Sequence, residues 1–298
     1  MILQTHELTK KYGEFFALNA VSLSVKQGDI YGLIGRNGAG KTTFFKCIMG
    51  LAKPTSGTII IQDAATHLNA ARQHMGFMIH PSFFSYLNPK ESLEYLCRIK
   101  GINPKGEVER LLKMVGLHDV KKPFKAFSLG MKQRLGIASA LLGSPSVVVL
   151  DEPINGLDPQ GIMDMRTVIK NAHTETGATF IISSHILAEL DLVATQFGFI
   201  EQGVLVKEIS HTDLHKLTQK SLIVKVDDVP KAQMALQTLG IVPVSVQENS
   251  LTLDSHLEQS NEVARVLMNS GVELYDLHRQ ETTLEEYFMR LIGGGKNA

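Results

Sequence analysis

A glycine-rich segment has the residue types and the spacing of a phosphate-binding loop. It fits the pattern G-x-x-x-x-G-K-[ST] with the run Gly35, Arg36, Asn37, Gly38, Ala39, Gly40, Lys41, Thr42, and a helical stretch begins at Thr43. Glycines let backbone N–H groups surround phosphate oxygens, and the helix N-terminus adds a positive partial charge. In this pattern Lys41 reaches the β- and γ-phosphates and Thr42 can bind Mg²⁺. The alternative is a simple glycine-rich turn. The apolar run at residues 30–34, directly before the loop, disfavours this alternative.

Two acidic residues, Asp151 and Glu152, follow the apolar run Val147–Leu150. At the end of a buried strand beside a phosphate-binding loop, Asp151 can hold the Mg²⁺ and Glu152 can polarise the attacking water. The alternative is an acidic turn before Pro153, which we would favour only without the phosphate-binding loop.

The elements that must position these residues fall into two regions. Residues 1–217 alternate short β-branched runs with longer helical patterns, which is typical of a mainly parallel sheet covered by helices. The strands we predict there are residues 30–34, 58–62, 147–150 and 179–183. From about residue 218 the order becomes β-α-β-β-α-β, which predicts a small ferredoxin-like α+β unit. A capping box, Thr283 to Glu286, and an apolar stripe predict a last helix.

The composition excludes several classes of protein. The 298 residues carry 30 Lys and Arg against 30 Asp and Glu, so the formal charge is zero, which argues against a large nucleic-acid interface. Two cysteines, Cys47 and Cys97, cannot form a disulfide framework and are most simply buried packing residues. The N-terminus has no signal-peptide pattern, and no apolar run is long enough for a membrane helix. We expect a cytosolic chain that acts at a membrane only through a partner.

Five motifs in this order resemble the nucleotide-binding domain of the ABC ATPase superfamily, over about residues 1–217. They are the phosphate-binding loop (Walker A), the signature segment Ser128-Leu129-Gly130-Met131, the strand ending at Asp151-Glu152 (Walker B), Gly156-Leu157-Asp158 and Ser184-His185. The resemblance implies an α/β P-loop NTPase fold of the ABC type with a helical subdomain at about 80–143. It also implies ATP hydrolysis with Mg²⁺, and leaves 218–298 as an accessory or regulatory domain.

The resemblance also implies roles for single residues. Ser128 and Gly130 match the signature residues that contact the γ-phosphate bound to the opposite subunit, so one chain holds two incomplete half-sites. His185 matches the switch histidine that contacts the γ-phosphate, and Asp158 matches the aspartate that couples the two sites. Tyr12 matches the aromatic residue that stacks on adenine. For each residue taken singly, an alternative remains open: core packing for Tyr12, a surface position for His185 and helix capping for Ser128.

The sequence departs from the commonest family pattern in two places. Leu129 and Met131 stand where the usual signature has Gly and Gln, and this form resembles the bacitracin-resistance and lantibiotic-immunity branch of ABC exporters. The loop at residues 78–84 lacks the family's Mg²⁺-contacting glutamine, and His80 is nearest by position. A neutral imidazole binds Mg²⁺ poorly compared with oxygen ligands, so His80 either bonds a water or plays no metal role. An ordinary loop histidine is the alternative.

Together these features predict an ATP-hydrolysing subunit that dimerises around two ATP–Mg²⁺ and powers export of a peptide or antibiotic-like substrate through a separate membrane permease. The second cassette is another copy or a paralogous ATPase, and the chain lies on the cytoplasmic face of the membrane. We expect the permease to dock between residues 80 and 125, where Phe83, Phe84, Tyr86 and Leu87 cluster, unless these side chains only pack the subdomain. The alternatives are a soluble ABC ATPase acting on nucleic acid or the ribosome, which the zero net charge and single cassette disfavour, and an importer ATPase.

Overall fold

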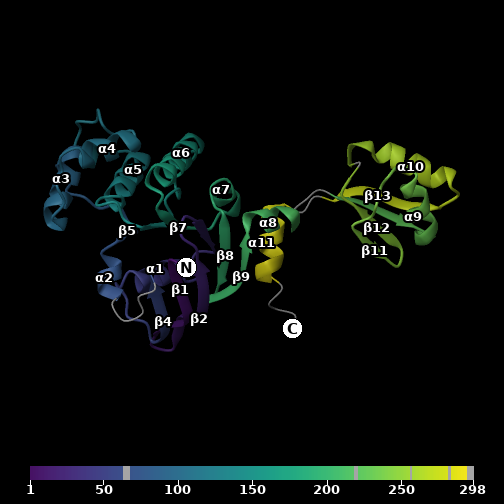
Figure 1. The fold of residues 1–298 in the computed structure, drawn as a ribbon, viewed down its shortest axis with the longest axis horizontal. Helices are drawn as coiled ribbons and strands as arrows, with labels where there is room; N and C mark the ends of the chain where they lie inside the picture. Colours follow the sequence, from purple (N-terminus) through teal and green to yellow (C-terminus); the bar gives the residue numbers. More distant parts are fainter. Residues whose placement is uncertain (63–67, 218–220, 256, 281–282, 294–298) are drawn as a thin grey trace. The chain divides into compact units, whose positions relative to one another are not determined.

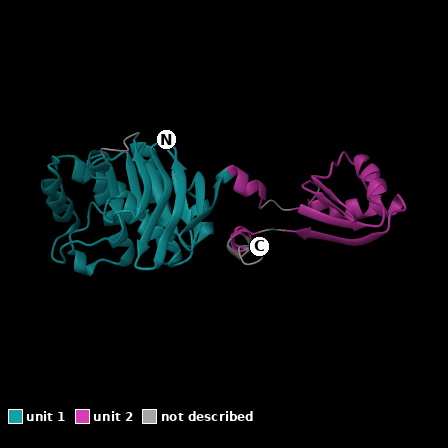
Figure 2. Ribbon diagram, turned by 90° about the horizontal axis from the view of Figure 1, so that it is seen from below, with its two compact units in different colours: residues 1–211 teal, residues 212–298 magenta. Residues whose placement is uncertain are grey.

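The computed structural model describes residues 1–62, 68–217, 221–255, 257–280 and 283–293. Over these residues the chain divides into two compact units, residues 1–211 and residues 212–298 (Figures 1 and 2). The helix α8 (His211–Leu217) begins at the last residue of the first unit. None of the helices in the described ranges is long and apolar enough to cross a membrane.

The first unit is built on a sheet with the strand order β5-β6-β7-β3-β8-β9. These strands are β5 (Met75–Met78), β6 (Val147–Asp151), β7 (Thr179–Ser184), β3 (Ile30–Ile34), β8 (Gln196–Glu201) and β9 (Val204–Ser210). All neighbours pair in parallel except β8 and β9. Every residue of β3, β6 and β7 is buried, as their apolar sequences predict for central strands covered on both faces.

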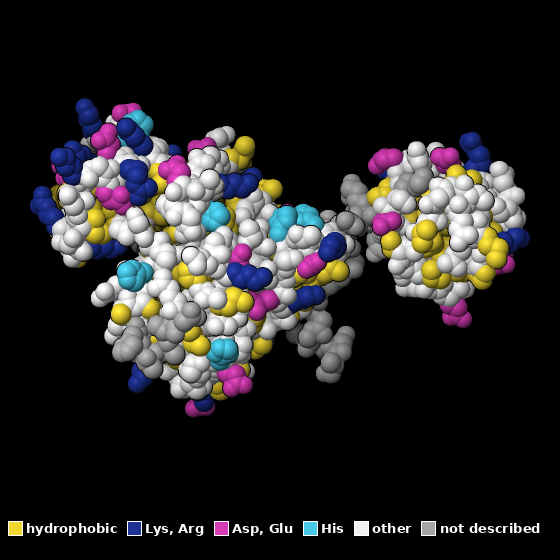
Figure 3. All heavy atoms as spheres, in the orientation of Figure 1, with side chains coloured by type: hydrophobic (Ala, Val, Ile, Leu, Met, Phe, Trp, Pro, Cys, Tyr) yellow, Lys and Arg dark blue, Asp and Glu magenta, His cyan; other side chains and the backbone are white. Residues whose placement is uncertain are grey.

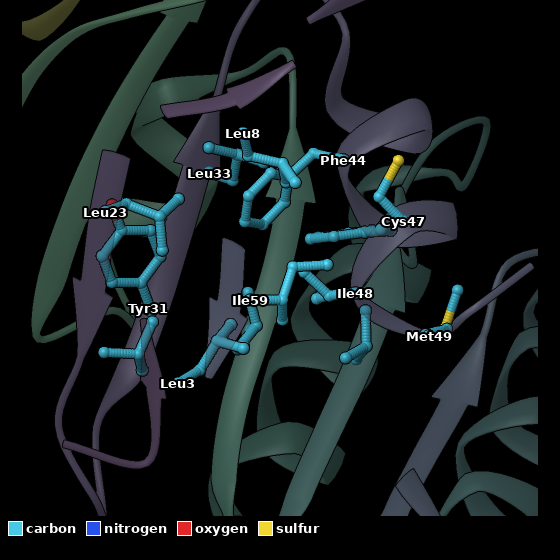
Figure 4. Close-up of a cluster of buried hydrophobic side chains, with 14 of the residues drawn as sticks. Leu3, Leu8, Leu23, Tyr31, Leu33, Phe44, Cys47, Ile48, Met49 and Ile59 are labelled. Carbon is cyan, nitrogen blue, oxygen red and sulfur yellow. The ribbon is translucent and has the colours of Figure 1, made fainter. Parts of the chain in front are cut away.

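A second, antiparallel sheet with the order β2-β1-β4 packs on the first. It consists of β1 (Leu3–Tyr12), β2 (Phe15–Val25) and β4 (Ser56–Ile61). Helix α1 (Lys41–Ile48) shares one apolar cluster with both sheets, and Phe44 and Ile48 point from it toward the strands (Figure 4). This burial anchors the start of α1, and hence the glycine-rich loop before it.

A group of helices forms the part of the first unit that begins after β5 (Figure 1). It contains α3 (Pro89–Lys100), α4 (Glu107–Met114), the short 3₁₀ helix η1 (Phe124–Ala126) and α5 (Leu129–Ala140). Lysine and arginine side chains gather on the surface of these helices, so the zero net charge is unevenly distributed (Figure 3). The remaining helices of this unit are α2 (Leu68–Arg72), α6 (Pro159–Thr176) and α7 (Leu187–Asp191).

The second unit has the predicted β-α-β-β-α-β order. Its elements are β10 (Ser221–Val226), α9 (Val229–Gln237), β11 (Ser245–Gln247), β12 (Ser250–Leu253), η2 (Leu257–Gln259), α10 (Ser260–Asn269), β13 (Leu274–Gln280) and α11 (Leu284–Gly293). The antiparallel order β11-β12-β10-β13 confirms the ferredoxin-like arrangement. The predicted capping box is also confirmed, because Glu286 N donates to Thr283 Oγ1 at 3.1 Å and Thr283 N donates to Glu286 Oε2 at 3.3 Å.

Candidate functional site

The site lies at the carboxyl ends of the central parallel strands. Ile34 at the end of β3 pairs with Ser184 of β7, and Asp151 at the end of β6 pairs with Ser183. Because parallel strands end at the same edge of the sheet, three segments far apart in sequence meet there. They are the glycine-rich loop of residues 35–42, the Asp151-Glu152 pair and the segment that carries His185.

The glycine-rich loop is held in its conformation by close backbone contacts. A Cβ atom on Gly35 would lie 2.4 Å from the carbonyl oxygen of Ile200, and one on Gly40 would lie 2.6 Å from that of Ala17. Gly40 and Gly38 also have φ values of +111° and +82°, which favour glycine. Among the residues that the structure describes, and apart from Gly38 and its two chain neighbours, no heavy atom lies within 4 Å of the Cβ position at Gly38, so the backbone is open to a ligand there. The loop leads into the N-terminus of α1, as a phosphate cradle requires.

Lys41 keeps its ammonium group at this loop. The residue is 5% exposed, and its Nζ donates to the carbonyl oxygens of Gly35 at 2.6 Å and Arg36 at 3.1 Å. Lys41 Nζ also lies 3.0 Å from Glu152 Oε1, which is an ion pair between largely buried side chains. Arg36 and Asn37 of the same loop are exposed, whereas Ala39 packs in the core.

Thr42 and Asp151 together offer oxygen atoms suited to a divalent cation. Thr42 Oγ1 donates to Asp151 Oδ2 at 2.6 Å, and Ser183 Oγ donates to Asp151 Oδ1 at 2.6 Å. Asp151 is only 6% exposed. A carboxylate and a hydroxyl beside a phosphate cradle are the protein ligands that Mg²⁺ commonly uses, so this donor set fits the ion. Thr43 follows within the first turn of α1 and is half-buried.

Glu152 and His185 form a second pair of side chains at the same edge. His185 Nδ1 donates to Glu152 Oε2 at 2.8 Å, which leaves the other ring nitrogen of His185 for a further partner. Among the atoms that the structure describes, Glu152 Oε1 is buried and accepts no hydrogen bond, although Lys41 Nζ is close to it. Glu152 also has a φ of +49°, a left-handed conformation that is uncommon for a residue with a side chain.

The signature segment lies beside the Gly156-Leu157-Asp158 segment. Ser128 is the N-cap of α5 and accepts a hydrogen bond from the backbone of Met131 at 3.3 Å, so the helix-capping interpretation is confirmed for its local structure. Leu129 is 44% exposed. A Cβ on Gly130 would lie 3.7 Å from the Leu157 side chain.

Asp158 is exposed and caps α6, because its Oδ1 accepts from the Gly161 backbone at 3.0 Å. Both segments thus present exposed helix N-termini, at Ser128 and at Asp158.

Tyr12 and His80 take no part in the hydrogen bonds and ion pairs described above. Tyr12 ends β1, is 51% exposed, and lies under the ammonium of Lys10, 4.7 Å from the ring centre. This exposure excludes the core-packing alternative for Tyr12. The hairpin that carries Tyr12 also carries Ala17, whose carbonyl oxygen lies close to Gly40, and this supports a position of the hairpin near the glycine-rich loop. His80 is exposed on the loop after β5 and lines a shallow hollow with Phe83 and Lys100.

Ser183 is a residue of this site that the sequence analysis missed. It bonds Asp151 and also accepts the backbone N–H of Glu152 at 2.9 Å. The available signal was a polar pair, Ser183-Ser184, at the end of an otherwise apolar strand.

Comparisons with known proteins agree with this geometry. The sequence profile of the ABC transporter family matches residues 18–155. The bacitracin transport ATP-binding protein BcrA of Bacillus licheniformis is 40% identical over 99% of this chain and 98% of its own length. The lantibiotic transport ATP-binding protein SrtF of Streptococcus pyogenes is 40% identical over 70% of this chain and 90% of its own length.

A similar solved structure is cbiO1 of Clostridium perfringens, described as part of the ABC transporter complex cbiONQ. It has a TM-score of 0.65 and 26% identity, and the match covers 72% of this chain and 90% of that one. The fold of the first unit is therefore that of an ABC ATPase cassette, as the motif order predicts. With a relative 40% identical over almost its whole length, the chain belongs to the ABC transporter family, as an ATP-binding and ATP-hydrolysing protein.

Proposed function

We propose that this protein is the ATPase subunit of an exporter for a peptide or antibiotic-like substrate, and that it works as a dimer around two ATP–Mg²⁺. The observation that carries the proposal is the assembly of Lys41, Thr42, Asp151, Glu152 and His185 at one edge of the sheet, beside a loop open to phosphates. The substrate class rests on relatives whose names refer to bacitracin transport and lantibiotic transport.

Within one half-site, each side chain has a task that its position allows. Backbone N–H groups of the loop and the Lys41 ammonium hold the β- and γ-phosphates. Thr42 and Asp151 hold Mg²⁺, which neutralises the developing charge on the phosphates. Glu152 accepts a proton from the attacking water through its Oε1, and His185, held by Glu152 Oε2, contacts the γ-phosphate.

The exposed signature segment completes the site of a second copy or a paralogous ATPase. Ser128, Leu129, Gly130 and Met131 stand at the N-terminus of α5, where backbone N–H groups and the helix dipole favour an anion. Asp158 lies next to this segment and couples the two sites across the dimer. Tyr12 stacks on the adenine, for which its half-exposed ring at the end of β1 is suitable.

The permease docks on the aromatic surface of the helical subdomain, residues 80–143. Phe84 and Tyr86 are 45% and 69% exposed and contact each other at 5.7 Å between ring centres. Phe84 also contacts Tyr95, which is 41% exposed, and these rings border a hollow of about 260 Å³. Exposed aromatic clusters of this kind favour a protein partner. Docking there would hold the chain at the cytoplasmic face of the membrane.

The remaining assignments follow the division of the chain. We assign ATP hydrolysis to residues 1–217 and an accessory or regulatory role to residues 218–298. His80 is exposed on the loop after β5, so we give it no role as a direct Mg²⁺ ligand.

The test is the molar mass of the full-length Glu152→Gln protein with and without ATP–Mg²⁺, measured by light scattering. The variant should bind ATP without hydrolysing it and should double in mass only when ATP is present. Ser128→Arg in the same background is the matched control, because it blocks the signature segment and leaves the phosphate-binding loop intact. A Glu152→Gln protein that binds ATP and stays monomeric would refute a dimer built from this chain alone.

A further inference from the structure

Ser183 joins the two acidic residues of the site. It lies at the end of β7 and is completely buried. Its hydroxyl donates to Asp151 Oδ1 at 2.6 Å, and the same oxygen accepts the backbone N–H of Glu152 at 2.9 Å. The directions are fixed, because an ionised carboxylate only accepts and a backbone N–H only donates.

Each of the two bonds constrains a feature that the reaction needs. The bond to Oδ1 sets the rotation of the Asp151 carboxylate, and with this rotation Oδ2 meets Thr42 Oγ1 at 2.6 Å. The bond to the Glu152 N–H helps to hold a backbone whose φ of +49° is disfavoured for a residue with a side chain. That backbone conformation aims the Glu152 side chain at Lys41 and His185.

We propose that Ser183 is a positioning residue for ATP hydrolysis, whose single hydroxyl fixes the metal-binding carboxylate of Asp151 and the backbone of Glu152 together. This inference rests on the proposed function, in which Asp151 holds Mg²⁺ and Glu152 polarises the water. Ser183 acts through these residues, because the bonds of its buried hydroxyl go to Asp151 and to the backbone of Glu152. Its removal therefore affects metal binding and turnover, and leaves the loop and Lys41 free to bind ATP.

The matched variants are Ser183→Ala and Thr179→Val in the full-length protein. Both residues are completely buried in β7, but Thr179 starts the strand, far from the site, and its hydroxyl oxygen accepts the backbone N–H of Gly28 at 2.9 Å. Ser183→Cys is the graded variant, because a thiol is close in shape and is only a weak donor and acceptor.

The first readout does not depend on activity. The affinity for Mn²⁺ in place of Mg²⁺ is followed by electron paramagnetic resonance, with a non-hydrolysable ATP analogue bound. Loss of a group that orients a metal ligand weakens metal binding by about 10- to 100-fold, so Ser183→Ala should raise the Mn²⁺ dissociation constant by about tenfold. Ser183→Cys should fall between Ser183→Ala and the wild type, and Thr179→Val should stay within about twofold of the wild type.

The second readout separates turnover from nucleotide binding. Small displacements of reacting groups cost about 100-fold in rate, so we expect Ser183→Ala to lower kcat by about 10- to 100-fold. Its affinity for a fluorescent ATP analogue without metal should change by less than about threefold, because the loop and Lys41 are unchanged. Equal losses in Ser183→Ala and Thr179→Val, or a Ser183→Ala protein with wild-type Mn²⁺ affinity, would overturn the proposal.

Glu152→Gln, measured beside these variants, separates a failure of the proposed function from a failure of the inference about Ser183. If Glu152→Gln hydrolyses ATP at the wild-type rate, the proposed role of Glu152 fails, whatever Ser183 does. If Glu152→Gln is inactive and Ser183→Ala behaves as wild type in both readouts, only the inference about Ser183 fails.

Discussion

Replacing Glu152 with glutamine should tighten the binding of ATP as well as slow its hydrolysis. Lys41 Nζ lies 3.0 Å from Glu152 Oε1, and the two side chains are 5% and 19% exposed. The ammonium also donates hydrogen bonds to two carbonyl oxygens of the glycine-rich loop. A phosphate that recruits Lys41 must therefore compete with the Glu152 carboxylate. Glutamine keeps the shape of the side chain and removes the competing charge.

The size of the effect follows from the separation of the two charges. At 3.0 Å and an effective dielectric constant of about 20, their attraction is about 5 kcal/mol. The cost of desolvating both groups offsets most of this attraction. We take the net free energy by which Glu152 weakens ATP binding as about 1.4 kcal/mol, which corresponds to about tenfold in affinity. Loss of the proposed general base should also lower kcat by about 10²- to 10⁴-fold. The variant should therefore combine tighter binding with almost no turnover.

The assay is an equilibrium titration with a fluorescent ATP analogue, with phosphate release measured on the same samples. Glu189→Gln is the control, because Arg166 and Glu189 also form an ion pair, at 3.1 Å, between mostly buried side chains, and this pair belongs to α6 and α7. That variant should bind and hydrolyse ATP as the wild type does. Unchanged or weaker binding by Glu152→Gln would refute the argument, because Glu152 would then not compete with the phosphates for Lys41.

Three further predictions concern the stability and the reactivity of the first unit. Gly76→Ala should lower the melting temperature strongly or prevent folding, because the added Cβ would lie 1.7 Å from a backbone carbonyl oxygen of α5; thermal unfolding followed by circular dichroism tests this. Tyr31→Phe should reduce the free energy of unfolding by about 2 kcal/mol in urea titrations, because the buried hydroxyl donates to Glu208 at 2.7 Å. Cys47 and Cys97 should react slowly with iodoacetamide until the protein is denatured, because both are buried and burial raises the pKa of each thiol; fast labelling of the folded protein, seen by mass spectrometry, would contradict this.

The central strands could be predicted from the sequence because their chemistry is local. Residues 147–150 and 179–183 consist mainly of β-branched and other apolar residues, and the structure has β6 and β7 there with only small shifts at the ends. The ferredoxin-like order of the second unit was predicted for the same reason. Predicted boundaries were less accurate: the strand expected at 58–62 is β4, which spans Ser56–Ile61.

The antiparallel strands β1 and β2 were not predicted. Their pairing contains several register shifts, and Glu7 and Ala20 have φ values of +48° and +50°. Such irregularities interrupt the alternation of buried and exposed residues on which strand prediction depends. The sheet that completes the environment of the phosphate-binding loop was therefore visible only in the folded structure.

The sequence by itself determined the family and the chemical types at the site. Five motifs in a fixed order, each with side chains of the required chemistry, were sufficient to predict an ABC-type ATPase with Lys41, Thr42, Asp151 and Glu152 in its centre. The tertiary structure alone decided how these groups contact one another. Lys41 meets Glu152, Thr42 meets Asp151, and Ser183 joins Asp151 to Glu152, because β6, β7 and β3 lie side by side and end at one edge. Spacing along the chain specifies each strand end. The hydrogen bonds between the strand ends depend on the order and register of strands that are far apart in the sequence.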